Sequence, residues 1–226
     1  GEATGVGSVS NIITVVNLSS SGAVADFGDL NAAQGRAGAL SSTTRGIIGG
    51  GLGANGSTKT DTIQYFTIGT SGSGSDFGNL SVGRTYITAS SNITRGIFAG
   101  GNAASDGASK DVMDYITIAS AGNATDFGNL SAVSERSTST SSTTRMIIGG
   151  GYRSSAAINI MEYVTIGSTG NVTDFGDLSV ARQNLDAVSS NTRSVFAGGT
   201  SSNVIDYVTT ASTGNASDFG DLTTSS

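Results

Sequence analysis

A block of 44 to 50 residues recurs along the whole chain, and this repetition constrains the fold more than any other feature. The tripeptide Asp-Phe-Gly occurs five times, beginning at Asp26, Asp76, Asp126, Asp174 and Asp218. The dipeptide Thr-Arg occurs four times, ending at Arg45, Arg95, Arg145 and Arg193. Repetition at this period predicts an array in which each repeat packs mainly against its neighbours.

Each repeat contains four short segments, and several of them show the apolar and polar alternation of half-buried strands. Strand A begins near an arginine, at Arg36, Arg84, Arg136 and Arg182. Strand B is the Thr-Arg segment and ends in Gly-Gly, strand C contains a tyrosine in an apolar stretch, and strand D is the Asp-Phe-Gly segment. The strand C tyrosines are Tyr65, Tyr115, Tyr163 and Tyr207. No segment has an apolar period of helical length.

Four strands in a repeat of this length are typical of a β-propeller blade. We therefore expect an all-β fold of about five blades, with residues 1–226 forming a single repeat domain. The half repeat 1–30 supplies strands C and D only, and the full repeats are 31–80, 81–130, 131–178 and 179–226. One blade is thus incomplete, and a four-bladed or open arrangement is the alternative.

The order of these residues resembles that of kelch repeats, in which Gly-Gly is followed by a tyrosine, an aromatic residue, a leucine and an arginine. One copy reads Gly100-Gly101, Tyr115, Phe127, Leu130, Arg136, and another reads Gly150-Gly151, Tyr163, Phe175, Leu178, Arg182. The resemblance covers nearly the whole chain, although phenylalanine stands where kelch repeats usually have tryptophan. It implies a kelch-like propeller. The Ser-, Thr- and Gly-rich style of the repeats is also similar to repeats in structural proteins of bacteriophages, which implies a tail fibre or another virion appendage.

The composition bears on several classes of function. The chain has no histidine and no cysteine, so it lacks the usual general base and the thiolate metal ligands. The formal net charge is −6, whereas a nucleic-acid-binding protein normally presents a basic surface. No apolar run reaches transmembrane length. We expect no enzymatic activity, no cofactor, no metal site, no nucleic-acid partner and no membrane insertion.

Recurring charged residues are interpreted as scaffold. Five copies of Asp-Phe-Gly in register do not fit a protein kinase, which has a single copy. Recurring arginines beside the aspartates of Asp-Phe-Gly predict charge-assisted hydrogen bonds between blades.

Positions at which the repeats differ are better candidates for function, and they lie mainly between strands B and C. These B–C loops are residues 52–60, 102–110, 152–158 and 200–202. Because loops on a rigid scaffold often carry binding residues, we predict a binding face formed by these loops. The candidate residues are Tyr152, Arg153, Lys59, Lys110, Asn55, Asn102 and Asp106. The alternative is that they are solvated loop tips without a ligand.

Two functions remain open at this point. The first is a non-enzymatic structural or adhesive propeller on a virion or extracellular surface, with other proteins of the assembly, surface glycans or further copies of the chain as partners. The second is a lectin-like carbohydrate-binding module with one weak site in each blade, which gains avidity from repetition.

Overall fold

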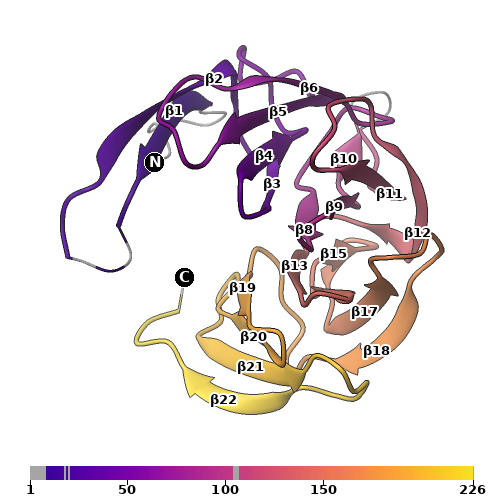
Figure 1. Cartoon of the computed structure of the whole chain (residues 1–226). Coiled ribbons are helices and arrows are strands. Elements are labelled where there is room, and N and C mark those ends of the chain that lie inside the picture. Colours follow the sequence, from indigo (N-terminus) through magenta and orange to yellow (C-terminus); the bar gives the residue numbers. More distant parts are fainter. Residues whose placement is uncertain (1–8, 18, 20, 104–106, 226) are drawn as a thin grey trace.

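The computed structural model describes residues 9–17, 19, 21–103 and 107–225, and β-strands are the regular elements of this part. The all-β prediction is therefore confirmed. The strands form four antiparallel sheets of four strands and three pairs of two strands. In Figure 1 the four large sheets follow one another along an arc, each with its first strand facing the middle.

Each large sheet consists of four strands in their order along the chain, so successive strands are joined as hairpins. The first sheet contains β3 (Gly38–Ser41), β4 (Arg45–Gly49), β5 (Thr62–Thr67) and β6 (Ser75–Asn79). The second contains β8 (Thr88–Ser91), β9 (Arg95–Ala99), β11 (Lys110–Thr117) and β12 (Thr125–Ser134). The third contains β13 (Thr138–Ser141), β14 (Arg145–Gly149), β17 (Ile160–Thr165) and β18 (Thr173–Asp177). The fourth contains β19 (Asp186–Ser189), β20 (Arg193–Ala197), β21 (Val204–Thr209) and β22 (Ser217–Asp221).

The N-terminal strands form a pair and not a complete sheet. β1 (Ser10–Val15) pairs with β2 (Ala25–Gln34), and these two strands occupy the positions of strands C and D. Two short pairs complete the set, β7 (Arg84–Thr85) with β10 (Asn102–Ala103) and β15 (Tyr152–Arg153) with β16 (Ala156–Ala157). In Figure 1 the β1–β2 pair and the fourth sheet lie on either side of the opening of the arc.

The hydrophobic core lies between successive sheets. One cluster joins Ile47 and Phe77 of the first sheet to Phe98 and Ile116 of the second. Two further clusters join the second sheet to the third and the third to the fourth. A single sheet has no partner for these faces, so each sheet depends on its neighbours for apolar burial.

The arginines of the Thr-Arg dipeptides bind each of the first three large sheets to the sheet that follows it. Arg45 lies over the Tyr65 ring of its own sheet and donates a 2.8 Å hydrogen bond to the carbonyl of Ile118, directly after β11 of the second sheet. Arg95 and Arg145 repeat both contacts, and Arg145 donates to the Thr210 carbonyl at 3.0 Å. The recurring arginine is thus a link between sheets and not a surface charge.

Arg193 provides a matched control, because it lies over Tyr207 at 4.4 Å but no sheet follows it in the described part of the chain. We expect Arg145→Ala to lower the free energy of unfolding by about 1.5 kcal/mol more than Arg193→Ala does. This is the lower end of the range for a hydrogen bond from a charged donor, since Arg145 is only half-buried. Equilibrium urea unfolding of both variants measures the difference, and equal losses would contradict a link between sheets.

The Asp-Phe-Gly segments contribute to packing through their phenylalanines and not through their aspartates. The phenylalanines Phe77, Phe127 and Phe175 are at most 2% exposed. The aspartates of all five copies are exposed, and the buried arginines pair instead with strand C carboxylates. The expected pairing between arginine and the Asp-Phe-Gly aspartate is therefore wrong.

Candidate binding face

The arginines near the start of strand A occupy two different structural positions. Arg84 and Arg182 lie eight residues after the aspartate of Asp-Phe-Gly, and both are buried. Arg36 and Arg136 lie ten residues after it, in the turn before the inner strand. The interpretation of the four as one recurring scaffold position is thus wrong, and the second pair belongs to a variable position.

The residue eight positions after the aspartate, or Arg153 in its place, forms a buried polar pair in each large sheet. In the first sheet this pair is Gln34 and Gln64, and the Gln64 amide donates to the Gln34 side-chain oxygen at 2.9 Å. Arg84 donates to the Asp114 carboxylate at 2.7 Å, and Arg182 donates to Asp206 at the same distance. Burial lowers the pKa of the Arg84 guanidinium below its ordinary value, and the Asp114 carboxylate opposes that shift. These charges are therefore engaged in packing.

Arg153, a candidate binding residue, supplies the same pairing in the third sheet. Its guanidinium donates to Glu162 at 2.6 Å, where Glu162 holds the strand C position that Asp114 has in the second sheet. The third repeat has Ser134 at the position that Arg84 and Arg182 hold in their repeats, and Arg153 supplies the arginine from strand β15 instead. The Arg153 side chain is 10% exposed and its charge is paired with Glu162, so the guanidinium is poorly available to a ligand.

The variable position is a series of four residues with left-handed backbone, namely Arg36, Tyr86, Arg136 and Asn184, with φ between 55° and 58°. Each of the last three donates its backbone N–H to the carbonyl of the preceding member, at 3.1 to 3.2 Å. The backbone is thus nearly the same at all four sites while the side chain changes. That is the pattern expected of a scaffold that presents different groups.

These four residues surround a hollow of about 380 Å³, which we call the central hollow. It opens at the end where the inner strands β3, β8, β13 and β19 begin. Its other lining residues are Ala37, Ile87, Ser137, Leu185 and Asp186. The guanidinium carbons of Arg36 and Arg136 lie 4.9 and 4.8 Å from the centre of the Tyr86 ring.

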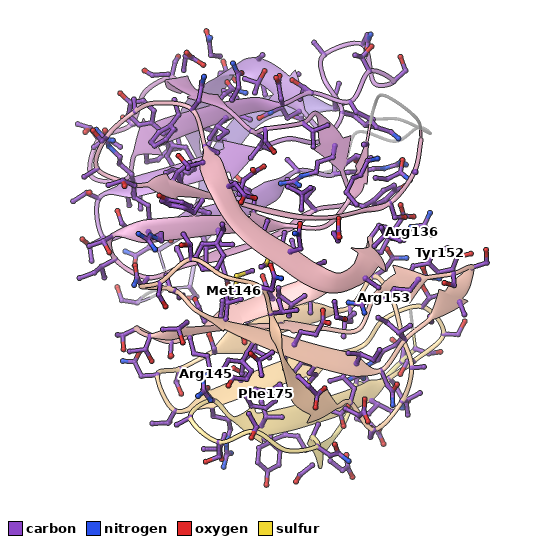
Figure 2. All side chains as sticks on the ribbon, turned by 90° about the vertical axis from the view of Figure 1, so that its right-hand side faces the viewer. Arg136, Arg145, Met146, Tyr152, Arg153 and Phe175 are labelled. Carbon is purple, nitrogen blue, oxygen red and sulfur yellow. The ribbon has the colours of Figure 1, made fainter. Side chains whose placement is uncertain are left out.

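Tyr152 extends this arrangement onto the predicted loop face. The Arg136 guanidinium lies 5.3 Å from the Tyr152 ring, and Figure 2 shows Arg136, Tyr152 and Arg153 at one edge of the molecule, away from Arg145 and Phe175. Arg136 also forms an ion pair with Glu135 at 3.3 Å and donates to Gln183 at 3.3 Å.

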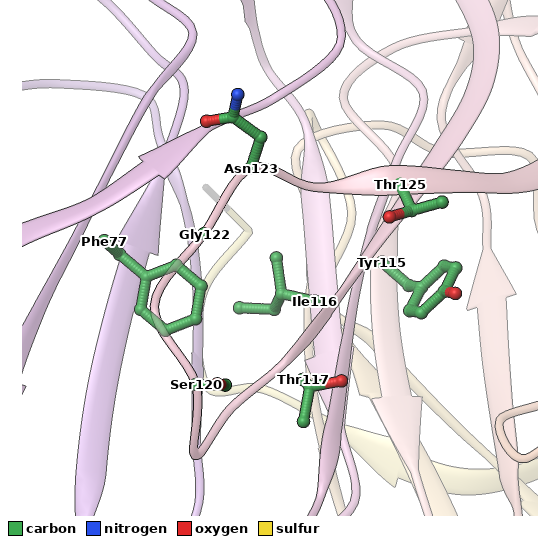
Figure 3. A pocket seen from close by; sticks show the side chains of 8 residues that line it. All are labelled: Phe77, Tyr115, Ile116, Thr117, Ser120, Gly122, Asn123 and Thr125. Atoms are coloured by element: carbon green, nitrogen blue, oxygen red, sulfur yellow. The ribbon is translucent and has the colours of Figure 1, made fainter.

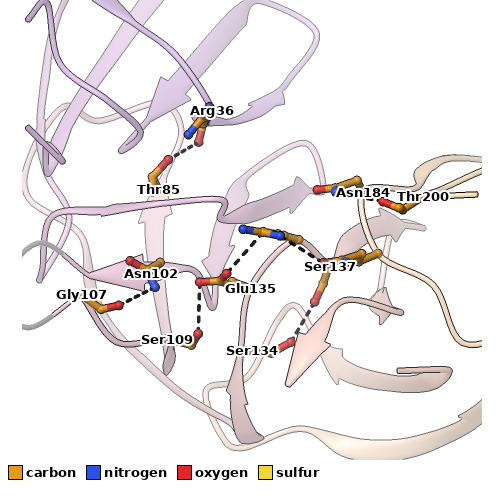
Figure 4. Close-up of polar contacts among 12 residues, drawn as sticks. Arg36, Thr85, Asn102, Gly107, Ser109, Ser134, Glu135, Ser137, Asn184 and Thr200 are labelled. Atoms are coloured by element: carbon orange, nitrogen blue, oxygen red, sulfur yellow. Dashed lines mark hydrogen bonds and ion pairs between the residues drawn. The ribbon is translucent and has the colours of Figure 1, made fainter. Parts of the chain in front are cut away.

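Neighbouring B–C loops are joined by polar contacts. Lys59 donates to the Asn102 side-chain oxygen and, at 2.8 Å, to the Ala103 carbonyl. The Asn102 side-chain amide donates to the Gly107 carbonyl, and the Ser109 hydroxyl donates to the Glu135 carboxylate at 3.1 Å (Figure 4). The structure thus brings Lys59, Asn102 and Tyr152 onto a face connected with the central hollow.

The remaining candidates are less informative. Asn55 is exposed and caps its own turn, since its side-chain oxygen accepts hydrogen bonds from the N–H groups of Ser57 and Thr58. Lys110 is half-buried at the start of β11. Asp106 lies outside the described residues.

Two other kinds of hollow differ in chemistry from the central one. A hollow of about 260 Å³ at the opposite end of the inner strands is lined by small polar groups and Ile93. Hollows of about 210 and 170 Å³ recur beside Tyr115 and Tyr163 at the C–D hairpins, and Figure 3 shows the first of them. Among these hollows, arginine side chains line only the central one.

The described residues contain no group of three or more acidic, histidine or cysteine side chains placed to hold a metal ion. They also contain no helix that is long and apolar enough to cross a membrane. Comparison with known proteins gives no matching family model and no matching curated protein.

Sequence reasoning proposed the loop face and missed the series Arg36, Tyr86, Arg136 and Asn184. The signal was present in the spacing, because counting ten residues from each of the first four Asp-Phe-Gly aspartates selects all four. Aligning the arginines with one another, regardless of that spacing, concealed the difference.

Proposed function

We propose that the chain is a kelch-like β-propeller with about five blades, one of them incomplete, that acts as a non-enzymatic structural and adhesive module on the exterior of an assembly. A bacteriophage virion appendage is the setting that the resemblance of the repeats favours. Its partners are other proteins of that assembly, further copies of the chain and surface glycans. The strongly buried arginines support this proposal, because they serve packing between strands and not a reaction.

One observation carries the assembly role. In each of the first three sheets, the face that carries the Asp-Phe-Gly phenylalanine is covered by the next sheet. In the fourth sheet the same face is exposed. Phe219 is 55% exposed, whereas the equivalent Phe175 is 1% exposed. Exposed apolar surface rimmed by polar groups is typical of a protein–protein contact.

The β1–β2 pair offers a complementary surface for this face. In the interior of the array, a hairpin glycine of one sheet donates its N–H to a phenylalanine carbonyl of the sheet before, as Gly214 does to Phe175 at 2.6 Å. Gly22 holds the corresponding place in the β1–β2 hairpin, seven residues after Val15, and a Cβ added to Gly22 would have no atom within 4 Å. A head-to-tail contact between copies would join Gly22 of one to Phe219 of the next.

We therefore expect the 22.4 kDa chain to self-associate in sedimentation velocity, and Phe219→Ser to weaken the association at least tenfold. Ile93→Ser is the matched control, because Ile93 is 68% exposed but lies in the turn between β8 and β9, away from the face around Phe219. A wild-type chain that stays monomeric at all concentrations would contradict this contact, as would equal effects of the two variants.

A lectin-like module is the second candidate, and the recurring hairpin hollows favour it. Tyr115 with Asn123 and Tyr163 with Asn171 line equivalent sites in two repeats, as expected for one weak sugar site in each blade. A glycan array tests this candidate: binding that disappears with Tyr152→Ala places the site on the loop face, and binding that survives this change favours the hairpins. Arg153 is left intact, because its removal would leave Glu162 without its ion-pair partner.

A further inference from the structure

The central hollow contains one arginine, Arg36, whose charge is not paired with an acidic residue among the described residues. The Arg36 guanidinium is exposed and lies over the Tyr86 ring, and among the described residues no hydrogen bond or ion pair engages it. Stacking uses the flat face of a guanidinium and leaves its N–H groups free in the plane. Those groups match the two oxygens of a carboxylate.

The second arginine of the hollow has a supporting role. Arg136 lies on the same Tyr86 ring and is held by Glu135 and Gln183. Its charge is therefore largely balanced, whereas its stacking fixes the ring on which Arg36 rests. The position of Arg36 is thus prepared before any ligand arrives, which reduces the entropy lost on binding.

The rest of the hollow suits a polar ring with one apolar face. Ile87 and Leu185 are buried beneath it, while the polar groups of Ser137, Asn184 and Asp186 line it. Asp186 belongs to β19, at the far end of the series of inner strands from Arg36. An acid group is therefore favoured near Arg36, and hydroxyl groups are favoured near Asp186. The volume of about 380 Å³ lies within the range of small-ligand sites.

The backbone at this position supports a role for the side chain. Arg36 and Tyr86 have φ of 55° and 56°, a conformation that costs a residue other than glycine roughly 1 kcal/mol or more. Glycine would relieve that cost, and the chain contains 34 glycines. Large side chains at strained positions are expected where the side chain has a function of its own.

We propose that the central hollow binds a carboxylated sugar, with Arg36 as the donor to the carboxylate and with the sugar ring between Tyr86 and Asn184. This site does not depend on self-association of the chain, since its residues lie at the inner strands and Phe219 lies on the outer strand β22.

The test is calorimetric titration of the full chain with glucuronate, glucose, acetate and sulfate. We expect glucuronate to bind at least tenfold more tightly than each of the other three. We expect Arg36→Gly to weaken glucuronate binding at least tenfold without lowering the melting temperature, because glycine accepts the left-handed backbone. Asn191→Asp is the control: it makes the same change in net charge at the opposite end of the inner strands.

Each other outcome overturns the proposal. Equal binding of glucose would remove the role of the carboxylate, and equal binding of acetate or sulfate would leave a general anion site. Equal weakening by Arg36→Gly and Asn191→Asp would assign the effect to net charge. If Arg36→Gly melts at a lower temperature, Arg36→Gln replaces it, and unchanged binding by that variant contradicts the proposal.

Discussion

Replacing Asp114 by alanine is expected to lower the free energy of unfolding by about 3–5 kcal/mol, which is typical of leaving a buried charge without its partner. Arg84 and Asp114 are both fully buried as side chains, and their closest atoms are 2.7 Å apart. Asp114 also accepts a hydrogen bond from the Ser81 N–H at 3.3 Å, so its removal frees a second donor. Equilibrium urea unfolding monitored by circular dichroism measures the loss.

Two controls show that the loss comes from the unpaired arginine. Asp126→Ala removes an exposed aspartate of Asp-Phe-Gly from the same sheet and should change stability by no more than about 0.5 kcal/mol. The double variant Arg84→Met, Asp114→Leu removes both charges and should recover most of the stability. Recovery is favoured because Arg84 Nε and Asp114 Oδ1 have no hydrogen-bond partner even in the intact pair. A double variant as unstable as Asp114→Ala would contradict the explanation.

The all-β fold could be predicted from the sequence because its signals are local and repeated. The tyrosine of strand C and the phenylalanine of strand D recur at fixed spacing, and the structure places them edge to face, as in Tyr115 and Phe127 at 6.0 Å. Apolar alternation and glycine-rich turns likewise depend on neighbouring residues. Such features identify strands without knowledge of what the strands contact.

The partners of the arginines could not be predicted in the same way, because they depend on contacts between strands that are distant in sequence. Arg84 pairs with Asp114 on β11, thirty residues later. Arg153 pairs with Glu162 in the repeat where the uncharged Ser134 stands at the position of Arg84. A sequence pattern shows that arginines and acids recur, but the pairing is decided by which strands lie side by side.

The central hollow shows the same limit. Arg36 and Tyr86 are fifty residues apart and become neighbours only when the inner strands stand in series. Their spacing from Asp-Phe-Gly marks them as equivalent, but a change from arginine to tyrosine resembles simple variation in a loop until the shared left-handed backbone is known.

Gly128→Ala is expected to cost more than Gly220→Ala, although both residues are the glycine of Asp-Phe-Gly and have φ of 142° and 138°. The shared backbone strain of alanine there is about 1–3 kcal/mol. At Gly128 a Cβ would also lie 2.3 Å from the Gly170 carbonyl oxygen in the next sheet, whereas nothing lies within 4 Å at Gly220.

The additional clash at Gly128 should cost about 1–3 kcal/mol, the usual range for overpacking. The clash would push the hairpin of the third sheet away from β12, to which it is bound by the 2.7 Å hydrogen bond from the Gly170 N–H to the Phe127 carbonyl. Urea unfolding of both variants gives the difference directly, because the strain is common to both. Equal losses would mean that the glycine serves only the local backbone. A larger loss at Gly128 would mean that Asp-Phe-Gly recurs because its glycine leaves room for the hairpin of the following sheet. The copy at Gly220 then retains a glycine that meets no neighbour among the described residues, as expected if another sheet covers that face.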